Sequence, residues 1–166
     1  VSGRLDLKAG GPGVAVHITP FMDGRGKPAS GPLDGAGRRS LYIAVRRNFL
    51  PPMMLAFDQP IPFTTMGRRN VSNVPAQALI LMNDPFVVEQ ARVWAKQTAS
   101  LNDPAARVRQ MYLAAFARLP SEDELRDALA FVSAQTQRLG KENKAELAWA
   151  DLGHVLFNVK EFIYVN

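Results

Sequence analysis

Apolar residues recur with a helical period through the last hundred residues of the chain. Nearly every position of residues 74–82 is apolar, which is typical of a buried helix. Three further stretches, which begin near Asp84, Asp103 and Ser121, carry an apolar stripe at three- and four-residue spacing, and a last one spans about 142–161. The spacing predicts a compact antiparallel bundle of roughly four to five helices joined by short loops.

Local signals mark where these helices begin and end. Asn-Asp-Pro occurs at 83–85 and again at 102–104, where aspartate is a suitable N-cap and proline a suitable first helical residue. Ser121 and Glu124 have the spacing of a capping box, and Gly140 is placed to end that helix. We therefore expect helices over about 85–99, 104–118 and 122–139.

The N-terminal part has a different pattern. Nine of the twelve glycines lie in residues 1–37, where they favour turns and extended chain. Apolar residues alternate over residues 41–46, which predicts a strand, and Val14–Ile18 is its natural partner. We expect a mainly α domain, in which a loop-rich segment with a small two-stranded β-element (1–73) precedes the helical bundle (74–166).

Charge is distributed unevenly along the chain. Residues 1–70 hold ten Lys/Arg and four Asp/Glu, a net charge of +6, whereas residues 71–166 hold ten and eleven, a net charge of −1. Such asymmetry indicates either an anionic partner or a basic surface that meets solvent or an acidic neighbouring domain. We favour the second interpretation.

Several classes of site are disfavoured. The chain has no cysteine, which excludes disulfides, thiolate metal sites and covalent haem attachment through Cys-x-x-Cys-His. Its two histidines, His17 and His154, are far apart, so we expect no metal site. No apolar run is long enough for a membrane span. Phosphate loops, nucleophile elbows and nucleic-acid modules are not recognisable, so we expect no bound cofactor, no nucleic acid and no catalytic set.

Polar residues within the helices form a second candidate feature. Asp151, His154, Asn158 and Glu161 lie beside the apolar stripe of the last helix, where His154 could act as an acid or base. A histidine at such an edge more often belongs to a structural network, and we favour that reading. Buried amides also need partners. The candidate polar network comprises Gln77, Asn83, Asp84, Asp151, His154 and Asn158.

Gly-Arg-Arg occurs twice, at 37–39 and 67–69. Arginine forks suit carboxylates and phosphates, and the helix that begins near Pro75 would add its dipole to an anion site if the two turns meet there. The alternative, which we favour, is an ion-paired scaffold corner. The candidate ligand-binding residues are Arg38, Arg39, Arg68, Arg69 and Asn70.

Three ordered blocks of the chain resemble a known family. They are GRRNVSNVPAQALILMNDPFVVEQAR, RVRQMYLAAFARLPSEDELRDALAFV and WADLGHVLFNVKEFIYVN. These blocks resemble the planctomycete-specific C-terminal domain of unknown function, and the resemblance covers nearly the whole chain. Val159 departs from it, because a small polar residue is expected there.

The resemblance implies a C-terminal module of a large extracytoplasmic protein, in the periplasm or cell envelope, with haem in cytochrome-c-like domains elsewhere in that protein. The missing initiator Met fits a fragment of a longer chain. No catalytic residue is implied. We expect a non-catalytic structural or interaction module that packs on an upstream domain of the same polypeptide. The alternatives are an anion- or polysaccharide-binding module, or an accessory part of a hydrolytic or redox enzyme that uses the regions of Arg68, Arg69 and His154.

Overall fold

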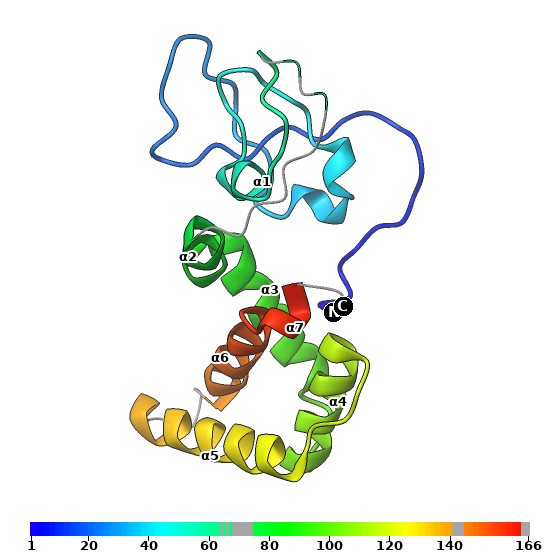
Figure 1. Ribbon diagram of the computed structural model, residues 1–166, viewed down its shortest axis with the longest axis vertical. Coiled ribbons are helices and arrows are strands. Elements are labelled where there is room, and N and C mark those ends of the chain that lie inside the picture. The colour runs from blue at the N-terminus through cyan, green and yellow to red at the C-terminus, as the bar shows by residue number, and fades with distance from the viewer. Residues whose placement is uncertain (64, 66, 68–74, 141–144, 164–166) are drawn as a thin grey trace. The chain divides into compact units, whose positions relative to one another are not determined.

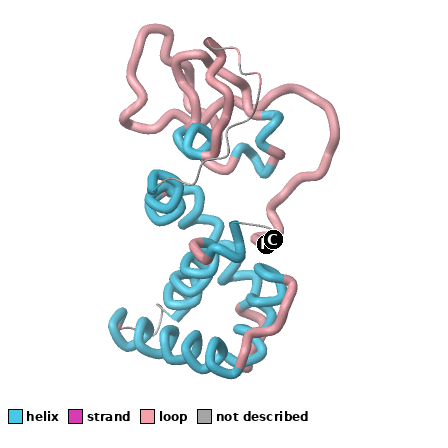
Figure 2. The backbone as a smooth tube through the Cα atoms, in the orientation of Figure 1, coloured by secondary structure: helices cyan, strands magenta, loops and turns pink. Residues whose placement is uncertain are grey.

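The computed structural model describes residues 1–63, 65, 67, 75–140 and 145–163 (Figure 1). Across these residues the regular structure is helical, and Figure 2 shows no strand. None of the helices that the structure describes is both long and apolar enough to cross a membrane. The α-helices are α1 (Pro52–Ala56), α2 (Pro75–Asn83), α3 (Pro85–Thr98), α4 (Pro104–Phe116), α5 (Glu122–Leu139), α6 (Ala145–Phe157) and α7 (Lys160–Ile163).

The predicted two-stranded β-element is wrong. Within the described part of the chain, its two segments share an isolated parallel bridge between Val14 and Ile43 and form no ladder. Ser40–Tyr42 is instead a 3₁₀ turn, so part of the alternating stretch hydrogen-bonds locally. The other segment turns away as well, because the amide of Gly31 donates to the carbonyl of Val16 at 2.9 Å. The pairing stops at this one bridge, where Val14 exchanges hydrogen bonds of 2.8 Å with Tyr42 and Ala44, so the alternating apolar residues did not produce a strand.

The helix-start predictions are confirmed. The Asp84 carboxylate accepts from the amide of Phe86, and the Asp103 carboxylate caps α4 in the same way, each followed by proline. Ser121 and Glu124 form a complete capping box, and Gly140 ends α5 in the left-handed conformation, with φ 64°. These helix ends could be predicted from the sequence because each capping residue acts within about four residues of its own position.

The predicted last helix is shorter than expected. Its described part, α6, ends at Phe157, and a turn separates it from the short helix α7. The amides of Asn158 and Val159 donate to the carbonyls three residues earlier, at 2.9 and 3.3 Å. The chain therefore leaves the α-helical path after Phe157, and α7 is an element of its own.

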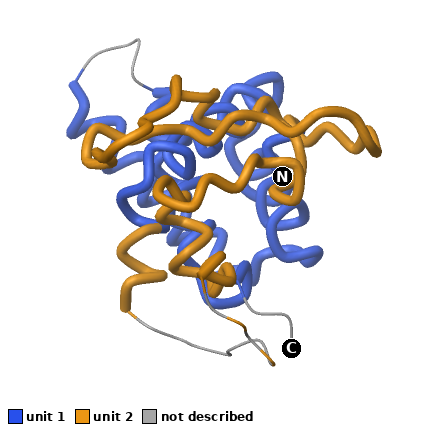
Figure 3. Tube along the Cα trace, turned by 90° about the horizontal axis from the view of Figure 1, so that it is seen from above, with its two compact units in different colours: residues 1–3, 81–166 blue, residues 4–80 orange. Residues whose placement is uncertain are grey.

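The chain divides into two compact units (Figure 3). Unit 1 comprises residues 1–3 and 81–166, and unit 2 comprises residues 4–80. The boundary predicted between residues 73 and 74 lies outside the described residues.

Unit 1 has a well-packed helical core. Helix α6 packs on α3 and on α5, and α4 packs on α5. Gly153 of α6 lies against the buried Trp94 of α3, and a Cβ at this position would be 3.1 Å from Trp94 Cε3. Trp94 also stacks on Phe157 of α6, with ring centroids 5.3 Å apart. The absence of a side chain at Gly153 is therefore what lets α3 and α6 approach so closely.

Unit 2 has very little core. Val16 and Phe49 are its only buried large hydrophobic side chains among the described residues. Loops hold it together instead, and Gly31 passes so close to the carbonyl of Ala15 that no Cβ would fit. Ten large hydrophobic side chains of unit 2 are exposed: Leu5, Leu7, Phe21, Leu33, Leu41, Val45, Leu55, Ile61, Phe63 and Leu79.

Candidate functional site

The predicted polar network is only partly assembled. His154 of α6 donates from Nε2 to the carbonyl of Leu81 at 2.9 Å, because a carbonyl oxygen can only accept. Asn158 donates from Nδ2 to the carbonyl of His154 at 2.8 Å, so these two residues lie together. Asp151 is exposed on α6. The Nε2 proton of His154 is thus used to tie α6 to the end of α2.

The other members of that network lie in different surroundings. Gln77 is buried in unit 2 and donates from Nε2 to the carbonyl of Ala56 at 2.9 Å, which ties α2 to α1. Asp84 caps α3, and Asn83 is exposed at the end of α2. The contacts of Gln77 and Asp84 therefore lie at different places, one between α1 and α2 and the other at the start of α3.

Arg38 of the candidate anion site is largely occupied within unit 2. Its Nη2 donates to the carbonyl of Gly10 at 2.6 Å, and its guanidinium lies 4.0 Å from the centre of the Tyr42 ring. The carboxylate of Asp6 is 3.9 Å from its Nε. Arg39 is exposed. The remaining candidates, Arg68, Arg69 and Asn70, lie outside the described residues.

Ser30 and His17 form a pair that sequence reasoning missed. Ser30 Oγ is 3.3 Å from His17 Nδ1, a separation that suggests a nucleophile and its base. However, the same Nδ1 is 3.1 Å from the carbonyl of Gly31, so it must carry a proton to donate there. A protonated Nδ1 cannot accept the serine proton. The pair therefore stabilises the loop, since Ser30 Oγ also accepts from the amide of Ile18 at 2.9 Å.

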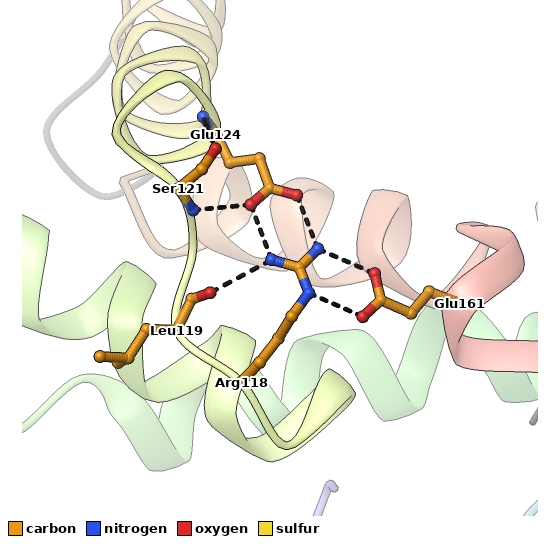
Figure 4. Close-up of polar contacts among 5 residues, drawn as sticks. All are labelled: Arg118, Leu119, Ser121, Glu124 and Glu161. Carbon is orange, nitrogen blue, oxygen red and sulfur yellow. Dashed lines mark hydrogen bonds and ion pairs between the residues drawn. The ribbon is translucent and has the colours of Figure 1, made fainter. Parts of the chain in front are cut away.

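The most elaborate polar cluster of unit 1 is centred on Arg118, between α4 and α5 (Figure 4). Ala117 ends α4 in the left-handed conformation, with φ 56°, and this turn directs the next residue back toward the helices. The guanidinium lies between the carboxylates of Glu124 and Glu161, and Figure 4 shows one on either side of it. A single side chain thereby joins the start of α5 to α7.

Every donor of Arg118 is used. Its nitrogens donate to Glu124 at 2.7 and 2.8 Å, to Glu161 at 2.7 and 2.8 Å, and to the carbonyl of Leu119 at 3.1 Å. These five bonds match the five N–H groups of a guanidinium. An external anion could therefore bind Arg118 only by displacing one of the two carboxylates.

The same contacts control the ionisation of the cluster. Hydrogen bonds from Arg118, and then from the amide of Ser121, lower the pKa of Glu124 to about 2. Hydrogen bonds from Arg118 also lower the pKa of Glu161. Burial, followed by the nearby charge of Glu124, raises the pKa of Tyr112. At neutral pH both carboxylates are therefore ionised, and neither is suited to donate a proton to a substrate.

A second arginine cluster lies in the core of unit 1. Arg107 of α4 is buried, and its Nη2 donates to the carbonyl of Ala95 at 2.6 Å. Its Nε donates to Thr98 Oγ1 at 3.0 Å, and its fork reaches Glu146 of α6 at 3.0 and 3.2 Å. The guanidinium also stacks on Trp149, at 4.2 Å from the ring centre. Arg107 therefore joins α3, α4 and α6.

Sequence reasoning missed both arginines, although one signal was present. Arg107 precedes Met111 by one helical turn, so it lies on the stripe that the periodicity places inward. Its acidic partner is 39 residues away, and the partner of Arg118 at α7 is 43 residues away. No local pattern identifies pairs at such separations. Among the described residues, no group of three or more His, Asp or Glu is placed to hold a metal ion.

A comparison with protein-family models identifies the family of this chain. A family model described as PSD1, protein of unknown function (DUF1553), matches residues 1–132 of the 166. Searches of curated proteins and of solved structures found no match. Because the matched region covers well over half of the chain, the chain belongs to the PSD1 (DUF1553) family of proteins of unknown function.

Proposed function

We propose that this chain is a non-catalytic structural or interaction module, which packs through unit 2 on an upstream domain of the same polypeptide. The observation that carries the proposal is the contrast between the few buried and many exposed hydrophobic side chains of unit 2. Phe21, Leu41 and Phe63 are 95%, 64% and 61% exposed. Exposed apolar surface of this kind marks sites of protein interaction when its side chains gather in a patch.

The charge of unit 2 supports the choice of partner. Its ten basic residues outnumber its four acidic residues, and two of those acids, Asp6 and Asp34, already lie beside Arg38 and Arg4. An acidic face on the neighbouring domain would complement this surface and direct the encounter. Burying the apolar side chains there would contribute about 25 cal/mol for each Å² removed from water.

The polar clusters support a scaffold role over a catalytic one. Arg118 uses all of its donors within unit 1, and the imidazoles of His17 and His154 each donate to a backbone carbonyl. Side chains whose donors are already used in such internal hydrogen bonds hold structural elements together. A catalytic role would instead need a base or nucleophile whose reactive atom is open to a substrate.

The finer identity of the parent protein rests on the resemblance described above. We propose a planctomycete-type C-terminal module of a large extracytoplasmic protein, in which cytochrome-c-like domains elsewhere in the polypeptide hold the haem. In that arrangement this chain binds no cofactor itself, and its partner is the domain that precedes it. Expression of the parent protein, followed by haem spectroscopy and cell fractionation, tests this assignment.

The test of the docking role compares the chain alone with the chain joined to its upstream domain. We expect the joined protein to melt at a higher temperature and to protect the amides of residues 41–63 from hydrogen exchange. Leu41→Ser in unit 2 should weaken both effects, whereas Leu113→Ser, at an exposed leucine of unit 1, should not. Equal protection in the free and joined forms would refute the proposal.

Anion or polysaccharide binding is the second candidate, and the basic excess of unit 2 is the observation that favours it. The guanidinium of Arg38 is already used by Gly10, Tyr42 and Asp6, so it would contribute little to anion binding. Arg39, together with Arg68 and Arg69, which lie outside the described residues, would then bind the anion. The measurement is retention on a sulfated polysaccharide over a salt gradient. Retention that survives alanine at all four arginines would rule out this site.

A further inference from the structure

Helix α7 is the shortest helix in the described part of unit 1, and it lies against α4 and α6. It has four residues, Lys160–Ile163, and a helix of that length has no stability of its own. A turn at Asn158 separates it from α6, so the hydrogen bonds of α6 do not extend into it. Its position must therefore come from the side chains that it places on the rest of unit 1.

Two side chains of α7 make well-defined contacts with the rest of unit 1. Glu161 accepts two hydrogen bonds from Arg118, at 2.7 and 2.8 Å, while Phe162 packs on Phe157 with ring centroids 5.1 Å apart. The side chains of Glu161 and Arg118 are 39% and 40% exposed, so water and salt reach this pair. Exposed ion pairs of this kind are weak, even when the geometry is bidentate.

An aromatic layer lies beneath α7. Phe157 is buried, and on another side it stacks on Trp94 of α3 at 5.3 Å. If α7 moved away, the face of Phe157 that Phe162 contacts would open to solvent. Trp94 would stay in place, because α3 and α6 pack along their lengths and Gly153 allows their close approach.

The position of the Arg118 guanidinium, which binds Glu161, does not depend on α7. Arg118 stays bonded to both oxygens of Glu124 and to the carbonyl of Leu119 when Glu161 leaves. Glu124 is in turn fixed by the capping box with Ser121. The guanidinium is therefore held in position to receive the carboxylate again, so that opening and closing are reversible.

We propose that α7 is a latch: Glu161 and Phe162 leave Arg118 and Phe157 together, which uncovers an aromatic face of α6 while α3, α4, α5 and α6 stay folded. The latch is an intramolecular device of unit 1. It is independent of the proposed docking of unit 2, and either proposal can fail without the other.

Hydrogen exchange on the intact chain, followed by mass spectrometry, tests the latch. Glu161→Gln keeps the size of the side chain and removes its charge, and we expect exchange over residues 159–163 to quicken by about two- to five-fold, the range for an exposed ion pair. Exchange in α3 and α6 should not change. Asp151→Asn, at an exposed acid of α6, is the matched control and should leave residues 159–163 unchanged.

Salt provides a second measurement that needs no variant. About 1 M NaCl should quicken exchange over residues 159–163 in the natural chain and much less in Glu161→Gln, because salt screens the ion pair. Two results would overturn the proposal. One is an unchanged exchange rate in Glu161→Gln, and the other is an equal rise in α3, α6 and α7, which would show that the whole unit opens together.

Discussion

Replacement of Arg107 by Met tests how unit 1 holds its three central helices. Methionine keeps an unbranched apolar stem beside Trp149 but removes every donor of the guanidinium. The carbonyl of Ala95 then loses the 2.6 Å bond from Arg107, and Thr98 loses a bond of 3.0 Å. The Ala95 carbonyl keeps its bond from Thr98 Oγ1 at 3.0 Å, so the end of α3 is weakened and not left unpaired.

The cost can be worked out from these contacts. A hydrogen bond from a charged donor contributes about 1.5–3 kcal/mol, and the second bond adds about 1 kcal/mol. The pair with Glu146 adds less than about 1 kcal/mol, because the Glu146 side chain is 46% exposed. Burial of the methionine offsets about 1 kcal/mol of this total. We therefore expect Arg107→Met to lower the free energy of unfolding by about 1.5–4 kcal/mol.

Tryptophan fluorescence during urea or thermal unfolding measures this loss. Both tryptophans, Trp94 and Trp149, lie in unit 1, so the signal follows that unit. The expected loss corresponds to a fall in Tm of about 3–16 °C for a chain of this length. In the folded variant the emission should change only through Trp149, which loses the stacked guanidinium, since the packing of Trp94 on Gly153 and Phe157 is untouched.

Glu146→Gln is the control for the ion pair alone. It should cost less than about 1 kcal/mol, because the partner lost is exposed while the bonds of Arg107 to Ala95 and Thr98 remain. A Glu146→Gln variant as unstable as Arg107→Met would refute the reasoning, since the ion pair would then carry the stability. A loss below about 1 kcal/mol for Arg107→Met would refute it equally.

Three further predictions concern single positions in unit 1. Gly153→Ala should destabilise by about 1–3 kcal/mol in chemical denaturation, because its Cβ would lie 3.1 Å from Trp94 Cε3. Ala117→Gly should raise the free energy of unfolding by about 0.5–1 kcal/mol, because φ is 56° there, and a lower Tm would contradict this. Glu124 has a pKa lowered from 4.5 to about 2, so its stabilising contribution is present above about pH 4.5 and is lost as pH falls toward 2. Glu124→Gln should flatten the stability profile over that range, and an unchanged profile would argue against the Arg118 contact as its cause.

The sequence by itself determined the helical part of the fold where the signals are local. Asp84, Asp103 and the Ser121–Glu124 box act on amides two or three residues away, and Gly140 acts on its own backbone. Such interactions form whatever the rest of the chain does, so they can be read from a single sequence. The early end of the last helix, at Phe157, had no comparable local signal.

Interactions between distant residues were decided only by the tertiary structure. Arg107 meets Glu146 across 39 positions and Arg118 meets Glu161 across 43, because helix packing brings their elements together. The alternating residues of 41–46 show the same limit, since their pairing with Val14 ends after one bridge and the Val16 carbonyl pairs with Gly31 instead. Caps are local and can be read from sequence, whereas an arginine fork or a β-ladder depends on which distant groups the fold places opposite it.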